Sequence, residues 1–420
     1  MSHSLSLQRL FLKCKTISKD AVIEVWGRVH AVDELRCVLG DQGFTAQLKL
    51  GKPFNLKLHD MVKLRCRGRD LHWIAENALE VHEFSHLQKM NVEEGGFVTP
   101  SSQVDRYHLW NKFIGLIEDY LKAQGLVRVQ TPTLVSCPGT EPHLQPFVTD
   151  FRWGKIQKKY FLPTSPELHL KKLLSAGFTD IYEIKSCFRN EELSTTHEPE
   201  FTMLEWYRAY ADLQLISEDL LGLLKHLQIT GFAPLSWGHV KRLSIAELFF
   251  NHLNFDLQPQ TSLEELTLLA RNCNLNVKGD ENWEDLFNWI FVAAIEPQLP
   301  HDRPVLVHSY PPQLCAFSRI NQLGWSERFE LYLCGFELAN AFDELTDADE
   351  YLKRMQKDLA QRRQLNREEV FLDQEFLYAM KFMPPAGGIA LGLERLFMAC
   401  LGLSHISQVR AFAKSGEFTL

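Results

Sequence analysis

The chain has 420 residues, of which 45% are hydrophobic and 23% charged, and its formal net charge is −8. This length exceeds that of one ordinary domain, and the composition is that of a globular protein with a large core. No apolar run is long enough for a membrane span, and the N-terminus lacks a basic start followed by a long apolar core. We therefore expect a cytoplasmic protein. The nine cysteines form no C-x-x-C pair, which argues against zinc.

Short alternating runs separated by turn residues predict a β-rich N-terminal domain over residues 1–90. Strands are expected at 22–29, 36–39, 44–50, 61–67 and 78–84. Five short strands suit a small barrel, and this part of the chain is mildly basic whereas the remainder is acidic. Trp26, Phe44, Lys63 and Arg65 could form a nucleic-acid groove, since single strands bind to aromatic platforms and basic residues. Alternatively, the aromatic residues form the barrel core and the charges are solvated.

A Gly-, Ser- and Pro-containing segment over residues 91–104 is typical of a linker, so we expect a second domain over 105–420. It opens with an amphipathic helix over 105–124. The run LVRVQTPTLV then predicts a strand that Pro132 bends or places at a sheet edge.

TSPELHLKKLL begins another helix, with Ser165 as a cap and Pro166 at the first helical position, followed by Glu167. Further elements are expected from hydrophobic periodicity. They are helices at 212–227, 244–252, 262–272, 283–294 and 347–364, and a strand at 301–310.

The segment CFRNEELSTTHEPEFTMLEWYRAY, residues 187–210, ends in a strand-like run. Alternation places Glu205 on one face with Phe201, Met203 and Tyr207, and Arg208 on the other. Either face, if buried, would therefore carry a charge, which is costly unless the charge is paired or binds a ligand.

Two later stretches reinforce a functional interpretation. In GFELANAFDELTD, Glu337, Asn340 and Glu344 lie among apolar residues, as suits a magnesium ion or a substrate amine. In AGGIALGLERL, closely spaced glycines would let a flat ligand approach the backbone, and Arg395 offers a fork of donors for phosphate oxygens. A helix cap at Glu344 and plain strand–helix packing at the glycines are the structural alternatives.

Together these residues carry a resemblance. FRNE…PEFTMLEWYR resembles motif 2 of the class II aminoacyl-tRNA synthetases, and GGIALGLERL resembles their motif 3. The similarity is closest to the lysyl branch and, within it, to the paralogues that act as elongation factor P beta-lysine ligases, over roughly residues 100–415. It implies an α+β fold: an antiparallel sheet flanked by helices, preceded by a small OB-like β-barrel. It also implies a homodimer formed through the helix and strand that resemble motif 1.

The resemblance implies a catalytic centre that uses ATP and Mg²⁺. Arg189 would bind the α-phosphate, Arg395 the γ-phosphate, Glu191 the adenine amino group and Glu337 magnesium, with Glu344 as a second ligand. The implied ATP-binding residues are Arg189, Asn190, Glu191, Glu198, Glu337, Leu338, Gly392 and Arg395. The implied substrate-binding residues are Ser165, Pro166, Glu167, Tyr207, Asn340, Glu344 and Ala390.

The implied reaction is activation of beta-lysine or lysine as an adenylate and transfer to a lysine side chain of elongation factor P. The alternatives are a compact lysyl-type tRNA synthetase, which would use the barrel to bind tRNA, and a catalytically silent relative. Ala390 replaces the glycine usual in lysyl-tRNA synthetases, which favours beta-lysine. Glu198 and Ala341 replace the family's usual asparagine and glycine, and either could alter ATP affinity or substrate choice.

Overall fold

The computed structural model describes residues 4–6, 22–32, 36–41, 44–50, 55–56, 61–69, 72–82 and 100–410. The chain divides into two compact units, Met1–Ile114 with Ser407–Leu420 and Gly115–Ile406. The linker predicted over 91–104 lies mostly outside the described residues, so the predicted domain division stays a prediction. Within the described ranges, no helix is long and apolar enough to cross a membrane.

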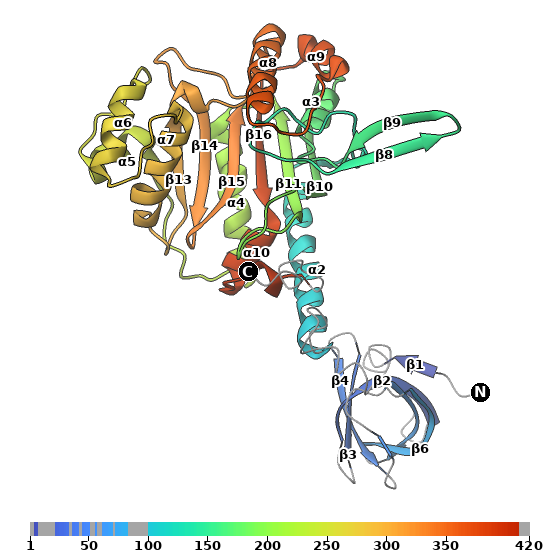
Figure 1. Cartoon of the computed structure of the whole chain (residues 1–420). Coiled ribbons are helices and arrows are strands. Elements are labelled where there is room, and N and C mark those ends of the chain that lie inside the picture. The colour runs from blue at the N-terminus through green and yellow to red at the C-terminus, as the bar shows by residue number, and fades with distance from the viewer. Residues whose placement is uncertain are drawn as a thin grey trace. The chain divides into compact units, whose positions relative to one another are not determined.

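The first unit contains a small β-barrel (Figure 1). Its strands are β1 (Ser4–Ser6), β2 (Val22–Val32), β3 (Arg36–Asp41), β4 (Phe44–Leu50), β5 (Met61–Arg69) and β6 (His72–His82). The order β2-β3-β4-β6-β5 is closed by pairing between β5 and β2, as expected for a five-stranded barrel. Val29, Leu39, Leu48 and Leu64 are buried. The last strand begins at His72, earlier than expected, and the side chains of the predicted groove residues lie outside the described ones.

The second unit is built on a sheet of order β12-β13-β14-β15-β16-β11-β10-β7 (Figure 1). Neighbouring strands are antiparallel except for β12–β13 and β10–β7, which confirms the predicted α+β class. The strands are β7 (Val127–Arg128), β10 (Asp180–Phe188), β11 (Glu200–Ala209), β12 (Lys241–Ser244), β13 (Val305–Tyr310), β14 (Ser326–Leu333), β15 (Phe336–Asp343) and β16 (Ala386–Gly392). A separate hairpin joins β8 (Val148–Trp153) to β9 (Ile156–Phe161).

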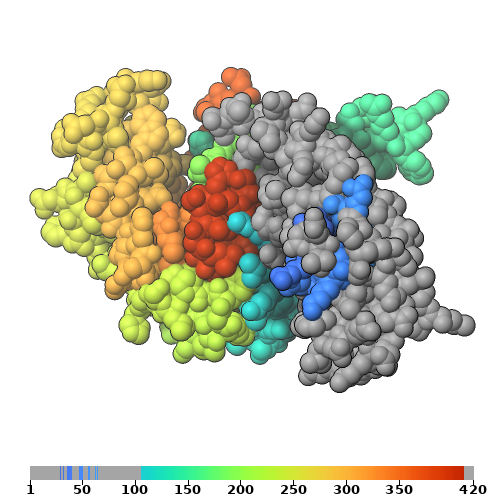
Figure 2. Space-filling view, turned by 90° about the horizontal axis from the view of Figure 1, so that it is seen from below, coloured from blue at the N-terminus to red at the C-terminus, as the bar shows by residue number. Residues whose placement is uncertain are grey.

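Helices surround this sheet. They are α3 (Glu167–Ser175), α4 (Leu213–Ile229), α5 (Ile245–Leu253), α6 (Leu263–Asn272), α7 (Trp283–Ile290), α8 (Ala348–Gln364), α9 (Gln374–Ala379) and α10 (Leu393–Leu401). Another helix, α2 (Pro100–Ala123), spans the boundary between the two units. α4 and α10 pack on one face of the central strands, and Figure 2 shows α10 (red) beside the segment that contains α4 (yellow-green). α3, α8 and α9 pack together at one end of the sheet (Figure 1).

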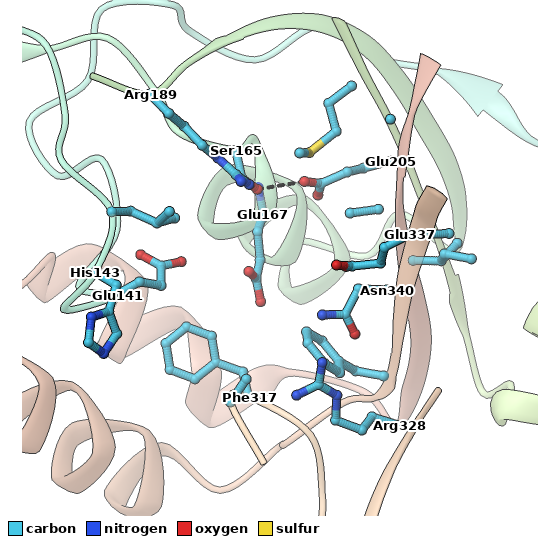
Figure 3. A pocket seen from close by; sticks show the side chains of 18 of the residues that line it. Glu141, His143, Ser165, Glu167, Arg189, Glu205, Phe317, Arg328, Glu337 and Asn340 are labelled. Atoms are coloured by element: carbon cyan, nitrogen blue, oxygen red, sulfur yellow. Dashed lines mark hydrogen bonds between the residues drawn. The ribbon is translucent and has the colours of Figure 1, made fainter. Parts of the chain in front are cut away.

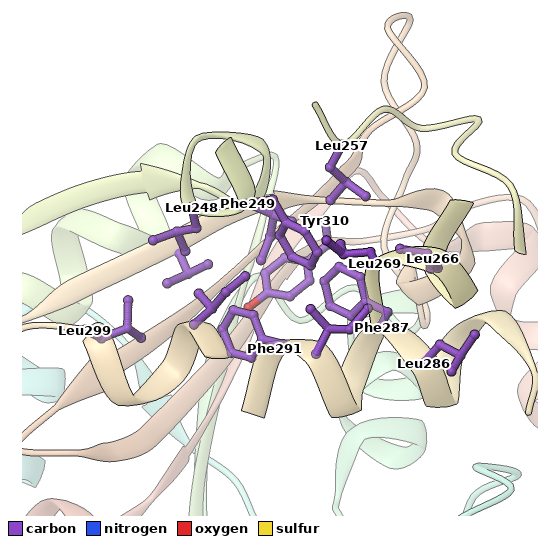
Figure 4. Close-up of a cluster of buried hydrophobic side chains, with 14 of the residues drawn as sticks. Leu248, Phe249, Leu257, Leu266, Leu269, Leu286, Phe287, Phe291, Leu299 and Tyr310 are labelled. Carbon is purple, nitrogen blue, oxygen red and sulfur yellow. The ribbon is translucent and has the colours of Figure 1, made fainter. Parts of the chain in front are cut away.

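Two predicted elements differ in extent. The strand predicted over LVRVQTPTLV is reduced to β7, because the chain turns away from β10 before Pro132, which has no N–H for a ladder. The helix predicted over 283–294 is α7 followed by a π turn, Phe291–Ile295. In that region Phe287 stacks between Phe249 and Phe291 in an apolar cluster that fixes α5, α6 and α7 against β13 (Figure 4).

Candidate active site

A cavity of about 520 Å³ opens on the face of the sheet opposite α4, and the first turn of α10 reaches it through Glu394 and Arg395. The strand β11 explains why it lies there. Met203, Glu205 and Tyr207 line the cavity, whereas Arg208 points to the other face and donates to Asp219 of α4 at 2.6 Å. The predicted alternation is therefore confirmed, and both buried faces carry a charge. Arg208 has a carboxylate partner, so Glu205 is the charge whose surroundings define the site.

Glu205 is held by two hydroxyl groups. Ser165 Oγ donates to Glu205 Oε1 at 2.5 Å, and Tyr207 OH donates to Oε2 at 3.1 Å (Figure 3). Only 1% of Glu205 is exposed, and this burial, together with the nearby charge of Glu167, raises the pKa of Glu205 to about 8. A cationic group that binds beside this carboxyl would lower its pKa and favour the ionised form.

A fully buried lysine lies beneath this carboxylate. Lys171 Nζ is 2.6 Å from Glu344 Oε2, donates to Glu167 and donates to Tyr351 OH at 3.1 Å. Burial raises the pKa of Glu344 to about 8, an effect that Lys171 opposes. Lys171 thus fixes the positions of two of the carboxylates that the sequence analysis assigned to the substrate amine.

The glycines of β16 make room for side chains. A Cβ on Gly388 would lie 2.3 Å from Glu344 Oε1 and 2.3 Å from Tyr207 Cε1. A Cβ on Gly387 would lie 2.6 Å from Ile216 of α4. Both glycines therefore make room for protein side chains rather than for a ligand. Gly387 allows close packing of the strand against α4, as in the structural alternative, whereas Gly388 makes room for Glu344 and Tyr207 of the substrate site.

The opposite end of the cavity contains two arginines. Arg395 Nη1 donates to the Glu337 carbonyl at 2.8 Å, and Arg395 also contacts the His197 ring. Burial and the charges of Arg395 and Arg189 lower the pKa of His197 to about 4, so its ring is neutral and can accept from Arg395. Arg189 lies over the Phe201 ring, 5.1 Å from its centroid. Two guanidinium groups that both lie near His197 suit a polyphosphate.

Motifs 2 and 3 are joined directly at this end. The Glu394 carboxylate accepts from the backbone N–H of Thr202 at 2.8 and 2.9 Å. This bond attaches the first turn of α10, which carries Arg395, to the start of β11. The two arginines are thus positioned by one shared framework.

A register shift in β15 places Glu337 in the cavity. Strict alternation would put Glu337 and Asn340 on opposite faces, but between Leu331 and Tyr332 the pairing slips, so that Tyr332 faces Glu337. Burial and the charge of Glu330 raise the pKa of Glu337 to about 7. Asn340 Oδ1 is buried without a hydrogen-bond partner (Figure 3).

The neighbouring strand β14 adds Arg328, which the sequence analysis missed. Its Nη1 donates to the Leu314 carbonyl at 2.7 Å, it is ion-paired with Glu330, and its guanidinium lies over the Tyr310 ring. The alternation of Arg328, Glu330 and Tyr332 within SERFELYL was the available signal. Lys171, His197 and Glu141 were missed as well, since nothing local marks them.

Most of the predicted site residues line this one cavity. These are Ser165, Glu167, Arg189, Glu198, Tyr207, Glu337, Leu338, Asn340, Glu344, Ala390, Gly392 and Arg395. Pro166 has helical backbone angles just before α3 and does not line the cavity, and the Ser165 hydroxyl accepts from the Glu167 N–H at 3.0 Å, which is the bond expected of the predicted cap.

The motif 2 residues Asn190 and Glu191 do not line the cavity. The Asn190 N–H donates to the Gln145 carbonyl at 2.7 Å. Glu191 has a φ of 66°, its side chain is 59% exposed, and it is ion-paired with Arg367 at 2.5 Å. The role of Glu191 toward adenine stays a prediction.

The fold and the site define a class II synthetase centre, and the comparison with sequence families agrees. The family described as tRNA synthetases class II (D, K and N) matches residues 101–416, and the chain belongs to this family. The match begins after the barrel strands.

Individual relatives narrow the similarity. The chain is 36% identical over 320 residues to the elongation factor P–(R)-beta-lysine ligase of Haemophilus influenzae, covering 75% of this chain and 96% of that protein. It is 34% identical over 322 residues to the protein of that name from Hamiltonella defensa, covering 74% and 96%. It is also 34% identical over 320 residues to the one from Proteus mirabilis, covering 74% and 96%. About a quarter of the chain therefore has no counterpart in these relatives.

Proposed function

We propose that this protein uses ATP to activate a diamino acid, beta-lysine or lysine, as an adenylate and transfers it to a lysine side chain of elongation factor P. The similarity to elongation factor P–(R)-beta-lysine ligases supports the acceptor and the substrate. The observation that carries the proposal is the charge balance at the closed end of the cavity. Glu167, Glu205 and Glu344 lie near Lys171.

Such an acidic cluster selects substrates by charge. Lys171 neutralises one negative charge and leaves an excess for the substrate. A diamino acid supplies two ammonium groups, whereas an amino acid with one amine would leave buried carboxylates unpaired. Glu205, with its Ser165 and Tyr207 donors, is the carboxylate placed to accept one ammonium group directly, because Glu344 is already paired with Lys171.

The other end of the cavity suits ATP. Arg189 and Arg395 would neutralise the phosphate oxygens, so that the substrate carboxylate can attack the α-phosphorus and pyrophosphate can leave. The neutral His197 and the Glu394–Thr202 bonds hold these groups in place. Ala390 faces Glu205 and Asn340 across the sheet, where its methyl group narrows the substrate end.

Magnesium fits the donor set near the arginines. Glu337 and the unsatisfied Asn340 Oδ1 offer oxygen atoms there, and Mg²⁺ is often bound by one or two protein groups together with substrate phosphates. The described residues hold no cluster of three or more His, Cys, Asp or Glu side chains suited to a metal. Bound magnesium would neutralise phosphate charge. Glu344, the second predicted ligand, is the ion-pair partner of Lys171, and its metal role stays a prediction.

The barrel keeps a second candidate function open. It is the part of the chain that precedes the family match, and an OB-like barrel could bind tRNA in a compact lysyl-type synthetase. A homodimer formed through α2 and β7 and a cytoplasmic location complete the proposal.

Acceptor choice tests the proposal. The purified protein is incubated with ATP and radiolabelled beta-lysine or lysine, and elongation factor P and total tRNA are offered in separate reactions. Label on the protein alone is the expected result. Label on tRNA alone would establish the synthetase alternative, and absence of ATP–pyrophosphate exchange by the folded protein would favour a silent relative.

A further inference from the structure

The cavity has its mouth where its lining residues are exposed. Among the described residues that line it, the exposed ones are His143, Asn288, Ala316 and Lys357. They come from the loop after β7, from α7, from the loop before β14 and from α8. Arg189 and Arg395, by contrast, are only partly exposed. The side of the cavity that carries His143 is thus open to a macromolecular acceptor.

Glu141 stands between this mouth and the substrate carboxylates. Figure 3 shows Glu141 and His143 across the cavity from Glu337 and Asn340, with Glu167 between them. The chain makes specific room for the Glu141 carboxylate, since a Cβ at Gly139 would lie 2.2 Å from Glu141 Oε2, and Gly139 has a φ of +132°. A side chain at residue 139 would be excluded on both grounds.

The loop that carries Glu141 is fixed from α8. Arg362 Nη1 donates to the carbonyls of Glu141 and Leu144, at 2.7 Å in each case. Thr140 Oγ1 donates to Asp358 Oδ2 at 2.9 Å. These bonds hold the backbone and leave the Glu141 carboxylate directed into the cavity.

We propose that the acceptor amine enters through this mouth and that Glu141 takes the proton from its ammonium group before the amine attacks the adenylate. This inference rests on the function proposed above. The nitrogen lone pair forms a bond to the carbonyl carbon of the adenylate, and the carbon–oxygen bond to the phosphate breaks. AMP leaves with that electron pair. The nitrogen of the new amide loses its second proton to water, and the proton held by Glu141 passes to solvent.

The charges around Glu141 suit a base that works near neutral pH. Burial and the charge of Glu167 raise the pKa of Glu141 to about 7, and Asp358 adds to this effect. Arg189 acts in the opposite sense, and Arg362 is the other cation that faces the group. A general base is most effective when its pKa lies near the working pH.

Glu141→Gln tests this role in the transfer step. Adenylate is preformed on the protein, and its single-turnover transfer is measured with two amines: a lysine side chain in elongation factor P, and hydroxylamine, which is largely unprotonated at neutral pH. Transfer to lysine should fall by about 100-fold, because general base catalysis is worth at least that factor. Transfer to hydroxylamine should change far less, and the rise of the lysine rate with pH near neutrality should disappear.

Glu375→Gln is the matched control, because its side chain is 91% exposed. Both rates should match those of the unaltered protein. Equal losses with both amines in the Glu141 variant would indicate a structural role and overturn the inference, as would unchanged transfer to lysine. If the unaltered protein exchanges pyrophosphate but labels no protein amine, the proposed function itself fails, and the role of Glu141 fails with it.

Discussion

Replacement of Lys171 by methionine should destabilise the second unit strongly. Lys171 and Glu344 are both 0% exposed, with 2.6 Å between Nζ and Oε2, and Lys171 also bonds Glu167. Methionine fills most of the space of the lysine stem but leaves two buried carboxylates without their cation. Breaking a buried ion pair in this way costs about 3–5 kcal/mol.

The free energy of unfolding is measured by urea denaturation, followed by tryptophan fluorescence and circular dichroism. The double variant Lys171→Met with Glu344→Gln should recover at least about 1 kcal/mol, because the amide removes one of the uncompensated charges. Lys353→Met is the matched control. Its side chain is 80% exposed, so we expect a change within about 0.5 kcal/mol.

Equal effects of the buried and exposed lysine substitutions would refute this reasoning, because the buried cation would then not be needed to hold the two carboxylates. A double variant less stable than Lys171→Met would also refute it. Such a result would mean that the Glu344 carboxyl contributes through other contacts.

Three further outcomes are expected. Arg395→Ala should lower ATP–pyrophosphate exchange by about 100-fold through loss of a preorganised phosphate donor. The control is Arg303→Ala, a half-buried arginine that does not line the cavity, and equal exchange rates in the two variants would contradict this prediction. Ala390→Gly should shift the ratio of kcat/KM for beta-lysine over lysine toward lysine by about 10-fold, and an unchanged ratio would remove Ala390 from the specificity site. Because burial raises the pKa of Glu205 to about 8 and of Glu337 to about 7, the folded state retains protons that the unfolded chain has lost. The free energy of unfolding should therefore fall as pH rises through about 7–8. Thermal denaturation at several pH values measures this change. A free energy of unfolding that rises over this pH range would contradict the raised pKa values of Glu205 and Glu337.

The sequence predicts the site better where chemistry and strand alternation coincide. The two faces of β11 were predicted from the alternation of Glu205 and Arg208, and the structure gives each charge a distinct environment. The position of Arg395 in motif 3 could also be predicted from the sequence, because Arg395 follows glycines at the start of a helix.

The rest depends on contacts between distant segments. Lys171 is indistinguishable from an exposed helical lysine until α8 and the end of β15 enclose it. Glu141 lies in a loop whose position is set by Arg362, 221 residues later in the chain. The local sequence could not distinguish the roles of Gly387 and Gly388, because these roles depend on distant residues. Gly387 faces Ile216, and Gly388 faces Glu344.

The irregularity in β15 makes the site sensitive to chain length as well as to side-chain identity. Because Tyr332 faces Glu337 only through the slipped pairing, removing Phe336 would place Leu338 opposite Tyr332 and restore regular alternation. Glu337 would then turn toward the face that α4 and α10 cover, where its charge would have no polyphosphate to meet. Among relatives that keep every motif residue, a single deletion at this position would thus mark proteins that have lost the adenylation reaction while keeping the fold.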